Sequence, residues 1–290
     1  MCPLRLECGP LFPKAEVMSA APEIRPDQSV ELLKALHILT RDGKLNQDSR
    51  RKLKQVYHLY NFIEPLLDEA FSTSADPVLV DHGAGKSYLG FILYDLFLKS
   101  RAKGKVIGIE TRAELVKSSR ALADKLGFGR MRFYDLSVEA SITSDVLPDH
   151  VDIVTALHAC NTATDDAIRF ALAKQAQFIV LVPCCQAEVA SILRKNKTAS
   201  LSQTPLAELW RHPIHTREFG SLITNVLRCL LLEAHGYSLT VTELVGWEHS
   251  MKNELIIARR ADAPRGNARE RLVAILDQLN LNELSDRFNY

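Results

Sequence analysis

Asp81, Gly83 and Gly85 lie where an apolar, β-branched run passes into a loop and then into an apolar, helix-compatible stretch, within the segment Val78–Leu89. A strand, a glycine loop and a helix in this order let the backbone approach a ligand closely, because only small residues permit that approach. The segment is therefore typical of a nucleotide-binding loop, and loops of three kinds share its outline.

Two of the three kinds fit only in part. A phosphate-binding loop needs G-x-x-x-x-G-K-[ST], and Val80 stands where its first glycine should be, although Gly85 and the Lys-Ser pair after it match. The dinucleotide fingerprint G-x-G-x-x-G holds Tyr88 at its third position. The third kind, an acidic residue followed by G-x-G, binds S-adenosylmethionine, and Asp81 with Gly83 and Gly85 satisfies it. Another nucleotide, or a turn without a ligand, stays open at this point.

Two more acidic residues follow at strand ends. The runs Lys105–Glu110 and Met131–Asp135 each read as a short strand that closes on a carboxylate. A carboxylate at the end of the second strand can accept both hydroxyls of a ribose, and Asp135 could accept from an adenine amino group. A helix cap or a solvated loop would explain any one of these acids. Three acids at three successive strand ends argue against coincidence.

The remaining pattern predicts the elements that position these residues. Val151–Leu157 and Gln177–Val182 are near-continuous apolar runs, as in a parallel sheet covered on both faces. Helices are predicted at 87–101, 112–126, 163–175 and 217–235. Tyr237–Val245 and Glu254–Ala258 are too close for a helical crossover and should form an antiparallel hairpin. The expected fold class is therefore α/β, with five parallel strands and a terminal hairpin.

The chain divides into four parts by composition. We expect a disordered tail over 1–25, a helical N-terminal extension over 26–75, the sheet domain over 76–262 and one C-terminal helix over 263–290. Apolar residues recur in the extension at helical spacing and should pack on the sheet domain: Leu53, Val56, Tyr57, Tyr60, Ile63 and Leu67. Pro65 should kink or restart that helix.

Composition limits the class of protein. Hydrophobic residues make up 47% and charged residues 24% of the 290 residues, which is ordinary for a globular protein. The formal net charge of +1 argues against a protein that coats duplex nucleic acid nonspecifically. No run approaches ~20 apolar residues and no signal-type apolar region opens the chain, so we expect a cytoplasmic protein without a membrane span. The cysteines lack metal-binding spacing, and no metal is expected.

Methyl transfer from a sulfonium is an in-line displacement, so the protein mainly has to position and desolvate the acceptor. His158, after the fourth strand, could act as a general base or hold the acceptor, or it could be satisfied by backbone. Cys184 and Cys185, after the fifth strand, are candidate nucleophiles or small packing residues. Contacts to the substrate are expected from Asn161, Gln186, Lys252 and Asn253.

A basic cluster precedes the glycine loop and is offset by only Asp42 and Asp48. It comprises Arg41, Lys44, Arg50, Arg51, Lys52 and Lys54. Such a cluster could hold a phosphate backbone, or it could be a solvated helix face.

Four segments together resemble one family. Asp81–Leu89, Leu157–Asn161, Pro183–Cys185 and Lys252–Ile256 are similar to the class I methyltransferase domain of the glutathione S-transferase C-terminal-domain-containing protein and of the tRNA acceptor-stem 2′-O-methyltransferases. The resemblance covers roughly residues 46–260 and implies a Rossmann-like seven-stranded fold. It also implies S-adenosylmethionine as cofactor, held by Asp81, Gly83, Ala84, Gly85, Lys86, Glu110, Asp135, Leu136, Leu157 and His158.

This chain departs from the family pattern at two positions, because Ser87 and Asn161 stand where that pattern has glycines. The sequence thus predicts an S-adenosylmethionine-dependent methyltransferase with RNA as the acceptor class. Two alternatives remain: a methyltransferase for protein or small molecules, and a non-catalytic binding protein that retains the fold. The sequence leaves the accepting atom and the oligomeric state open.

Overall fold

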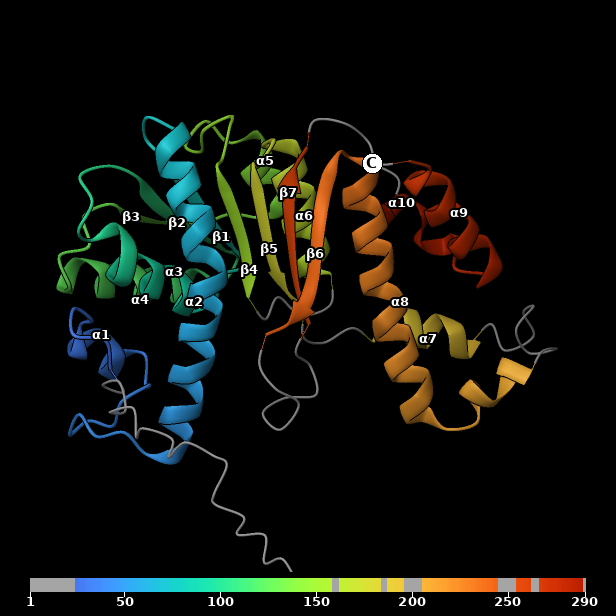
Figure 1. Cartoon of the computed structure of the whole chain (residues 1–290), viewed down its shortest axis with the longest axis horizontal. Helices are drawn as coiled ribbons and strands as arrows, with labels where there is room; N and C mark the ends of the chain where they lie inside the picture. The colour runs from blue at the N-terminus through green and yellow to red at the C-terminus, as the bar shows by residue number, and fades with distance from the viewer. Residues whose placement is uncertain are drawn as a thin grey trace, which may run out of the picture.

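The computed structural model describes residues 24–157, 162–183, 187–195, 205–244, 254–261 and 266–288. These residues build a seven-stranded sheet with the order β3-β2-β1-β4-β5-β7-β6 (Figure 1). The strands are β1 (Val78–His82), β2 (Lys105–Glu110), β3 (Met131–Asp135), β4 (Ile153–Leu157), β5 (Phe178–Val182), β6 (Tyr237–Glu243) and β7 (Glu254–Arg260). Strands β1 to β5 pair in parallel, and β7 pairs antiparallel with both β5 and β6. The sheet confirms the predicted class I methyltransferase fold.

Helices cover both faces of the sheet. Along β1, Leu79 joins one apolar cluster with α2, α3 and α4, whereas Val80 joins a second cluster with α6, α8 and α9. The alternation follows from the period of two in a strand, and cover on both faces explains the near-continuous apolar runs. The helices after β1 are α3 (Tyr88–Leu93, continued by a π-helical turn Tyr94–Leu98), α4 (Ala113–Lys125), α5 (Val138–Thr143), α6 (Ala163–Ala173), α7 (Glu188–Lys195), a 3-10 turn (Pro205–Trp210) and α8 (Pro213–Ala234). None of the described helices is long and apolar enough to span a membrane.

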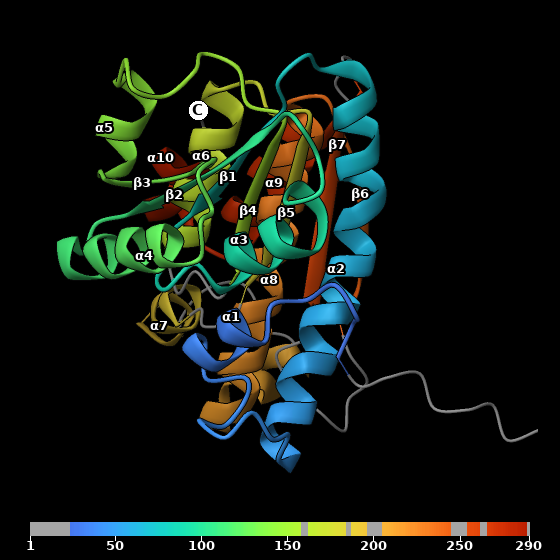
Figure 2. The same ribbon diagram turned by 90° about the vertical axis from the view of Figure 1, so that its left-hand side faces the viewer.

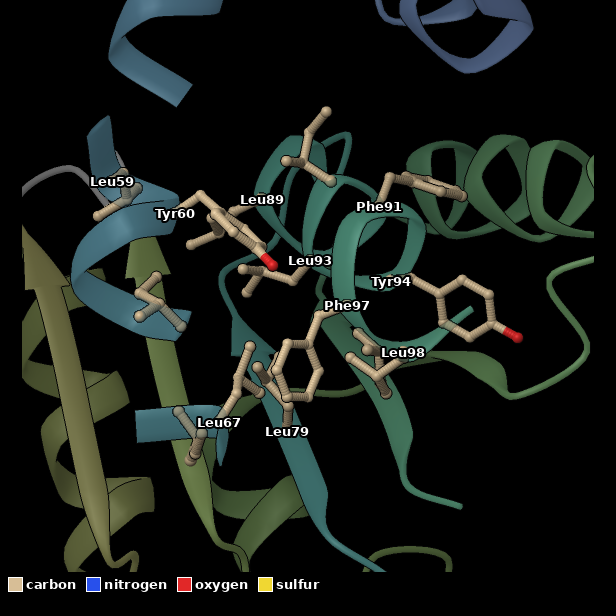
Figure 3. Close-up of a cluster of buried hydrophobic side chains, with 14 of the residues drawn as sticks. Leu59, Tyr60, Leu67, Leu79, Leu89, Phe91, Leu93, Tyr94, Phe97 and Leu98 are labelled. Atoms are coloured by element: carbon tan, nitrogen blue, oxygen red, sulfur yellow. The ribbon is translucent and has the colours of Figure 1, made fainter. Parts of the chain in front are cut away.

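The N-terminal extension contains α1 (Val30–Ala35) and the long helix α2 (Gln47–Thr73). From Leu59 onward, α2 packs apolar side chains such as Leu59 and Leu67 into one cluster with Leu79 and Leu89 of the sheet domain (Figure 3), as the helical spacing predicted. The first half of α2, together with α1, lies beyond the carboxyl ends of the parallel strands (Figure 1 and Figure 2). The extension therefore reaches the edge of the sheet where ligands of such folds bind.

Pro65 does not restart α2, which is continuous over Gln47–Thr73. A proline ring removes one backbone donor and crowds the preceding turn. On either side of the ring, Ile63, Leu66 and Leu67 are buried in the contact with the sheet domain. This packing holds the helix together across the proline.

The C-terminal segment, expected as one helix, is interrupted. It consists of α9 (Ala268–Gln278), a 3-10 turn (Asn282–Leu284) and α10 (Ser285–Phe288). Asn280 adopts a left-handed backbone with φ of 51°, which a helix cannot continue but which asparagine tolerates better than most residues. The reversal lets Leu281 and Phe288 return to the apolar cluster that α9 already contacts.

Candidate functional site

A cavity of about 400 Å³ opens at the carboxyl ends of β1 and β4. The chain order reverses between these two neighbours, because β2 and β3 lie on one side and β5 lies on the other. Ligands of open α/β sheets bind at such a switch point. The cavity is lined by Ile38, Lys52, Gln55, Val56, Asp81, Gly83, Ala84, Gly85, Lys86, Tyr88, Leu89, Arg112 and Leu157.

The glycine loop reaches the cavity through an alternating left-handed backbone. Gly83, Gly85 and Ser87 have φ angles of 67°, 58° and 50°. Glycine adopts this conformation without steric cost, whereas a residue with a Cβ atom loses about 1–2 kcal/mol. Ser87 thus holds a backbone conformation that glycine adopts more easily.

The Ser87 side chain bonds to a buried carboxylate. Its Oγ donates to Oδ2 of Asp81 over 2.9 Å, and Oγ1 of Thr155 on β4 donates to Oδ1 over 3.1 Å. Burial raises the pKa of Asp81 to about 6, although both hydroxyl bonds act in the opposite direction. Asp81 was predicted to hold the cofactor; it lines the cavity and also ties the loop and β4 to the end of β1.

Glu110 lies at the end of β2 with its carboxylate turned toward the loop. The backbone N–H of Gly85 donates to Oε2 over 2.7 Å, and the backbone N–H of Arg112 donates to Oε1 over 3.1 Å. The guanidinium of Arg112 adds two bonds, from Nε over 2.9 Å and from Nη2 over 3.1 Å. Burial alone would raise the pKa of Glu110, but these bonds outweigh it and hold the pKa below its usual value.

Some of the other predicted cofactor contacts line the cavity, and some do not. Ala84, Lys86 and Leu157 line the cavity. Asp135 is exposed beside Glu110 at the end of β3, and neither Asp135 nor Leu136 is among the described lining residues. Strand β3 is two places from β1, a separation of about 9–10 Å across the sheet.

His82, between Asp81 and Gly83, points away from this wall. Its ring is 6% exposed, lies 5.2 Å from the Phe170 ring of α6, and has no hydrogen-bond partner among the described residues. Burial lowers the pKa of His82 to about 4, so the ring is neutral at pH 7. His82 therefore packs the loop against α6 as an uncharged side chain.

The predicted acceptor side of the site lies outside the described residues. This holds for the candidates for the chemical step and for the predicted substrate contacts: His158, Cys184, Cys185, Asn161, Gln186, Lys252 and Asn253. Within the described residues, no group of His, Cys, Asp and Glu has the arrangement of a metal site.

The sequence did not single out several cavity residues as cofactor contacts. Lys52, Gln55 and Val56 come from the first half of α2, Ile38 from the segment before it, and Arg112 from the residue before α4. Lys52, Gln55 and Val56 are spaced so that they share one face of the helix. That spacing is the signal by which they could have been found.

Comparison with known proteins finds similar sequences. The sequence profile of a family described as a methyltransferase domain matches residues 51–192. The chain is 23% identical over 241 residues to the glutathione S-transferase C-terminal domain-containing protein of Bos taurus, a match that covers 75% of this chain and 34% of that protein. The corresponding protein of Mus musculus is 24% identical over 234 residues. The chain thus spans about a third of the length of these curated relatives.

The solved structures that match this chain have low sequence identity to it. The SAH-bound Podospora anserina methyltransferase PaMTH1 matches with a TM-score of 0.44 and 13% identity, over 80% of this chain and 88% of that one. An rRNA methylase from Streptococcus thermophilus matches with a TM-score of 0.40 and 9% identity, over 68% of this chain and 93% of that one.

Proposed function

We propose that this chain, whose sheet has the strand order of the class I methyltransferase fold, transfers a methyl group from S-adenosylmethionine to RNA. The observation that carries the cofactor assignment is the cavity at the switch point between β1 and β4. Glu110 is not among its described lining residues, but the Gly85 N–H of the lining holds the Glu110 carboxylate against the glycine loop. A carboxylate fixed in this way is suited to a ribose diol.

The cavity fits the proposed cofactor in size and chemistry. Its volume of about 400 Å³ lies within the usual range of small-molecule sites. Gly83 and Gly85 have left-handed backbones and carry no Cβ atoms that would narrow the cavity. Ile38, Val56 and Leu157 form the apolar part of the cavity wall. We expect Glu110 to hold the ribose and the loop to face the methionine part. S-adenosylmethionine supplies, when bound, a sulfonium-linked methyl group and its leaving group.

A basic surface beside the cavity supports RNA as the acceptor class. Between residues 41 and 54 the chain has six cations and two carboxylates, and all six cations are exposed. This stretch includes the first half of α2, beyond the carboxyl ends of the strands (Figure 1), and its Lys52 lines the cavity. A second depression of about 950 Å³ adjoins the start of α2 and is lined in part by Lys34, Arg41 and Lys125, the last of which is paired with Glu31 of the same lining. A phosphate backbone is attracted to such a surface.

The first test is isothermal titration of the purified chain with S-adenosylmethionine, S-adenosylhomocysteine, ATP and NAD. We expect micromolar binding of the first two ligands and much weaker binding of them by Glu110→Gln, because an amide offers fewer acceptor positions to the ribose. Preferential binding of ATP would overturn the cofactor assignment.

The acceptor is tested with a labelled methyl donor and separate cellular RNA and protein fractions. We expect label in RNA that ribonuclease removes, with transfer that falls steeply as salt rises. Label confined to protein would favour a protein methyltransferase. Cofactor binding with no transfer to any fraction would favour a binding protein that retains the fold.

A further inference from the structure

The Glu110 carboxylate has no acceptor position left. A carboxylate has about four lone-pair positions, and four N–H groups already donate to this one: two backbone groups, of Gly85 and Arg112, and two guanidinium groups, both of Arg112. The hydroxyl of Thr111 adds a longer contact of 3.4 Å. Any further donor can bond to Glu110 only if one of these donors leaves.

The four main donors differ in how easily they can leave. The two backbone donors are fixed by the glycine loop and by the turn that starts α4 (Ala113–Lys125), so they hold the carboxylate in place. The two guanidinium donors sit on a side chain that is 60% exposed and lines the cavity. Two movable donors match in number the two hydroxyls of a ribose.

We propose that the Arg112 guanidinium competes with the ribose hydroxyls of the cofactor for Glu110, so that Arg112 sets cofactor affinity by being displaced. The inference rests on the proposed function, because it concerns the same site. The two backbone bonds stay while Arg112 swings outward. Arg112 thereby keeps the buried carboxylate paired until a nucleoside replaces it, and the exchange leaves no unpaired charge.

The competition is weak enough to permit binding. Solvent weakens an ion pair whose cation is exposed, and the Arg112 side chain is 60% exposed although that of Glu110 is only 8% exposed. Removal of the guanidinium should therefore tighten cofactor binding about two- to fivefold. Salt screens the Arg112–Glu110 attraction, so high salt should tighten binding in the wild type and have no such effect once Arg112 is replaced.

The experiment is isothermal titration of the full chain with S-adenosylhomocysteine, which lacks the charged sulfonium, at about 0.05 M and 0.5 M salt. The variants are Arg112→Met and, as matched control, Arg169→Met, because Arg169 also pairs with a glutamate on the surface, with Nη1 3.1 Å from Oε1 of Glu139. We expect about two- to fivefold tighter binding by R112M at low salt, convergence with wild type at high salt, and no change in R169M. Arg112→Lys keeps the charge but loses the two parallel guanidinium donors, so its affinity for S-adenosylhomocysteine should lie between those of wild type and R112M.

Equal or weaker binding by R112M than by wild type, with R169M unchanged, would overturn the inference and leave the proposed function standing. Absence of binding by wild type and every variant would overturn the proposed function, and the inference with it. A thermal unfolding midpoint for R112M within a few degrees of wild type confirms that the comparison is made on folded protein, as expected for an exposed side chain.

Discussion

Ser87 has an unfavourable left-handed backbone conformation and a favourable hydrogen bond to Asp81, and mutation can separate the two contributions to stability. Ser87→Ala keeps the Cβ atom at φ of 50° and removes the 2.9 Å bond to the buried Asp81 carboxylate. A hydrogen bond to a charged group contributes about 1.5–3 kcal/mol, so S87A should lose that much free energy of unfolding. Ser87→Gly loses the same bond but relieves the left-handed strain, so its loss should be about 1 kcal/mol smaller.

The assay is urea unfolding of wild type, S87A and S87G at pH 8, where Asp81 is ionised. Ser118→Ala serves as control, because Ser118 is exposed on α4 and donates only to a backbone carbonyl. That control should stay within about 0.5 kcal/mol of wild type. If S87A is as stable as S118A, the Asp81 bond contributes nothing; if S87G is no more stable than S87A, the strain argument is wrong.

Three further predictions follow from charges. Burial raises the pKa of Asp81 to about 6, so ionisation costs stability as pH rises. The unfolding free energy of wild type relative to Asp81→Asn should fall by about 2 kcal/mol between pH 4 and 7, and urea unfolding that gives a pH-independent difference would contradict this. Arg228 is fully buried and donates from Nε and Nη2 to both oxygens of Asp165. Arg228→Met removes both of these bonds from a buried carboxylate and should cost about 3–5 kcal/mol in urea unfolding, whereas a loss below 1 kcal/mol would refute this. Lys52→Gln should lower the slope of log binding constant against log salt concentration by about 1 for RNA in filter binding, and Arg169→Gln should leave that slope unchanged. Equal slopes in the two variants would exclude Lys52 from the phosphate contact.

Those parts of the fold that depend on local pattern were predictable. Five apolar runs form parallel strands, and the two C-terminal runs form the hairpin β6–β7. Strand periodicity and connection length depend only on residues that are close together in the sequence. Glu110 was predicted as a cofactor contact from its place at a strand end; the structure places its carboxylate against the Gly85 N–H, and the cofactor contact stays a prediction. The bond from Ser87 to Asp81 was not predicted, because it depends on a left-handed backbone that no sequence rule assigns to serine.

The place of a strand in the sheet is not a local property. Asp81, Glu110 and Asp135 look equivalent in sequence, since each closes a strand before a helix. In the sheet their strands are neighbours in the order β1, β2, β3, so Asp135 is the farthest from the switch point. The cavity accordingly has Asp81 in its wall, Glu110 against its loop and Asp135 outside its described lining.

The contribution of α2 to the cavity follows from one stripe along that helix. Residues 52, 55, 56, 59, 63 and 67 recur at helical spacing and share a face. Where the stripe passes over the sheet it is apolar, and Leu59, Ile63 and Leu67 are buried. Where it continues beyond the strand ends, Lys52 and Gln55 line the cavity. Lys52 is exposed and Gln55 is half-buried, so at this end the stripe no longer faces the core. The change from leucine to lysine and glutamine along one face therefore marks the point at which α2 leaves the core and begins to form the wall of the site.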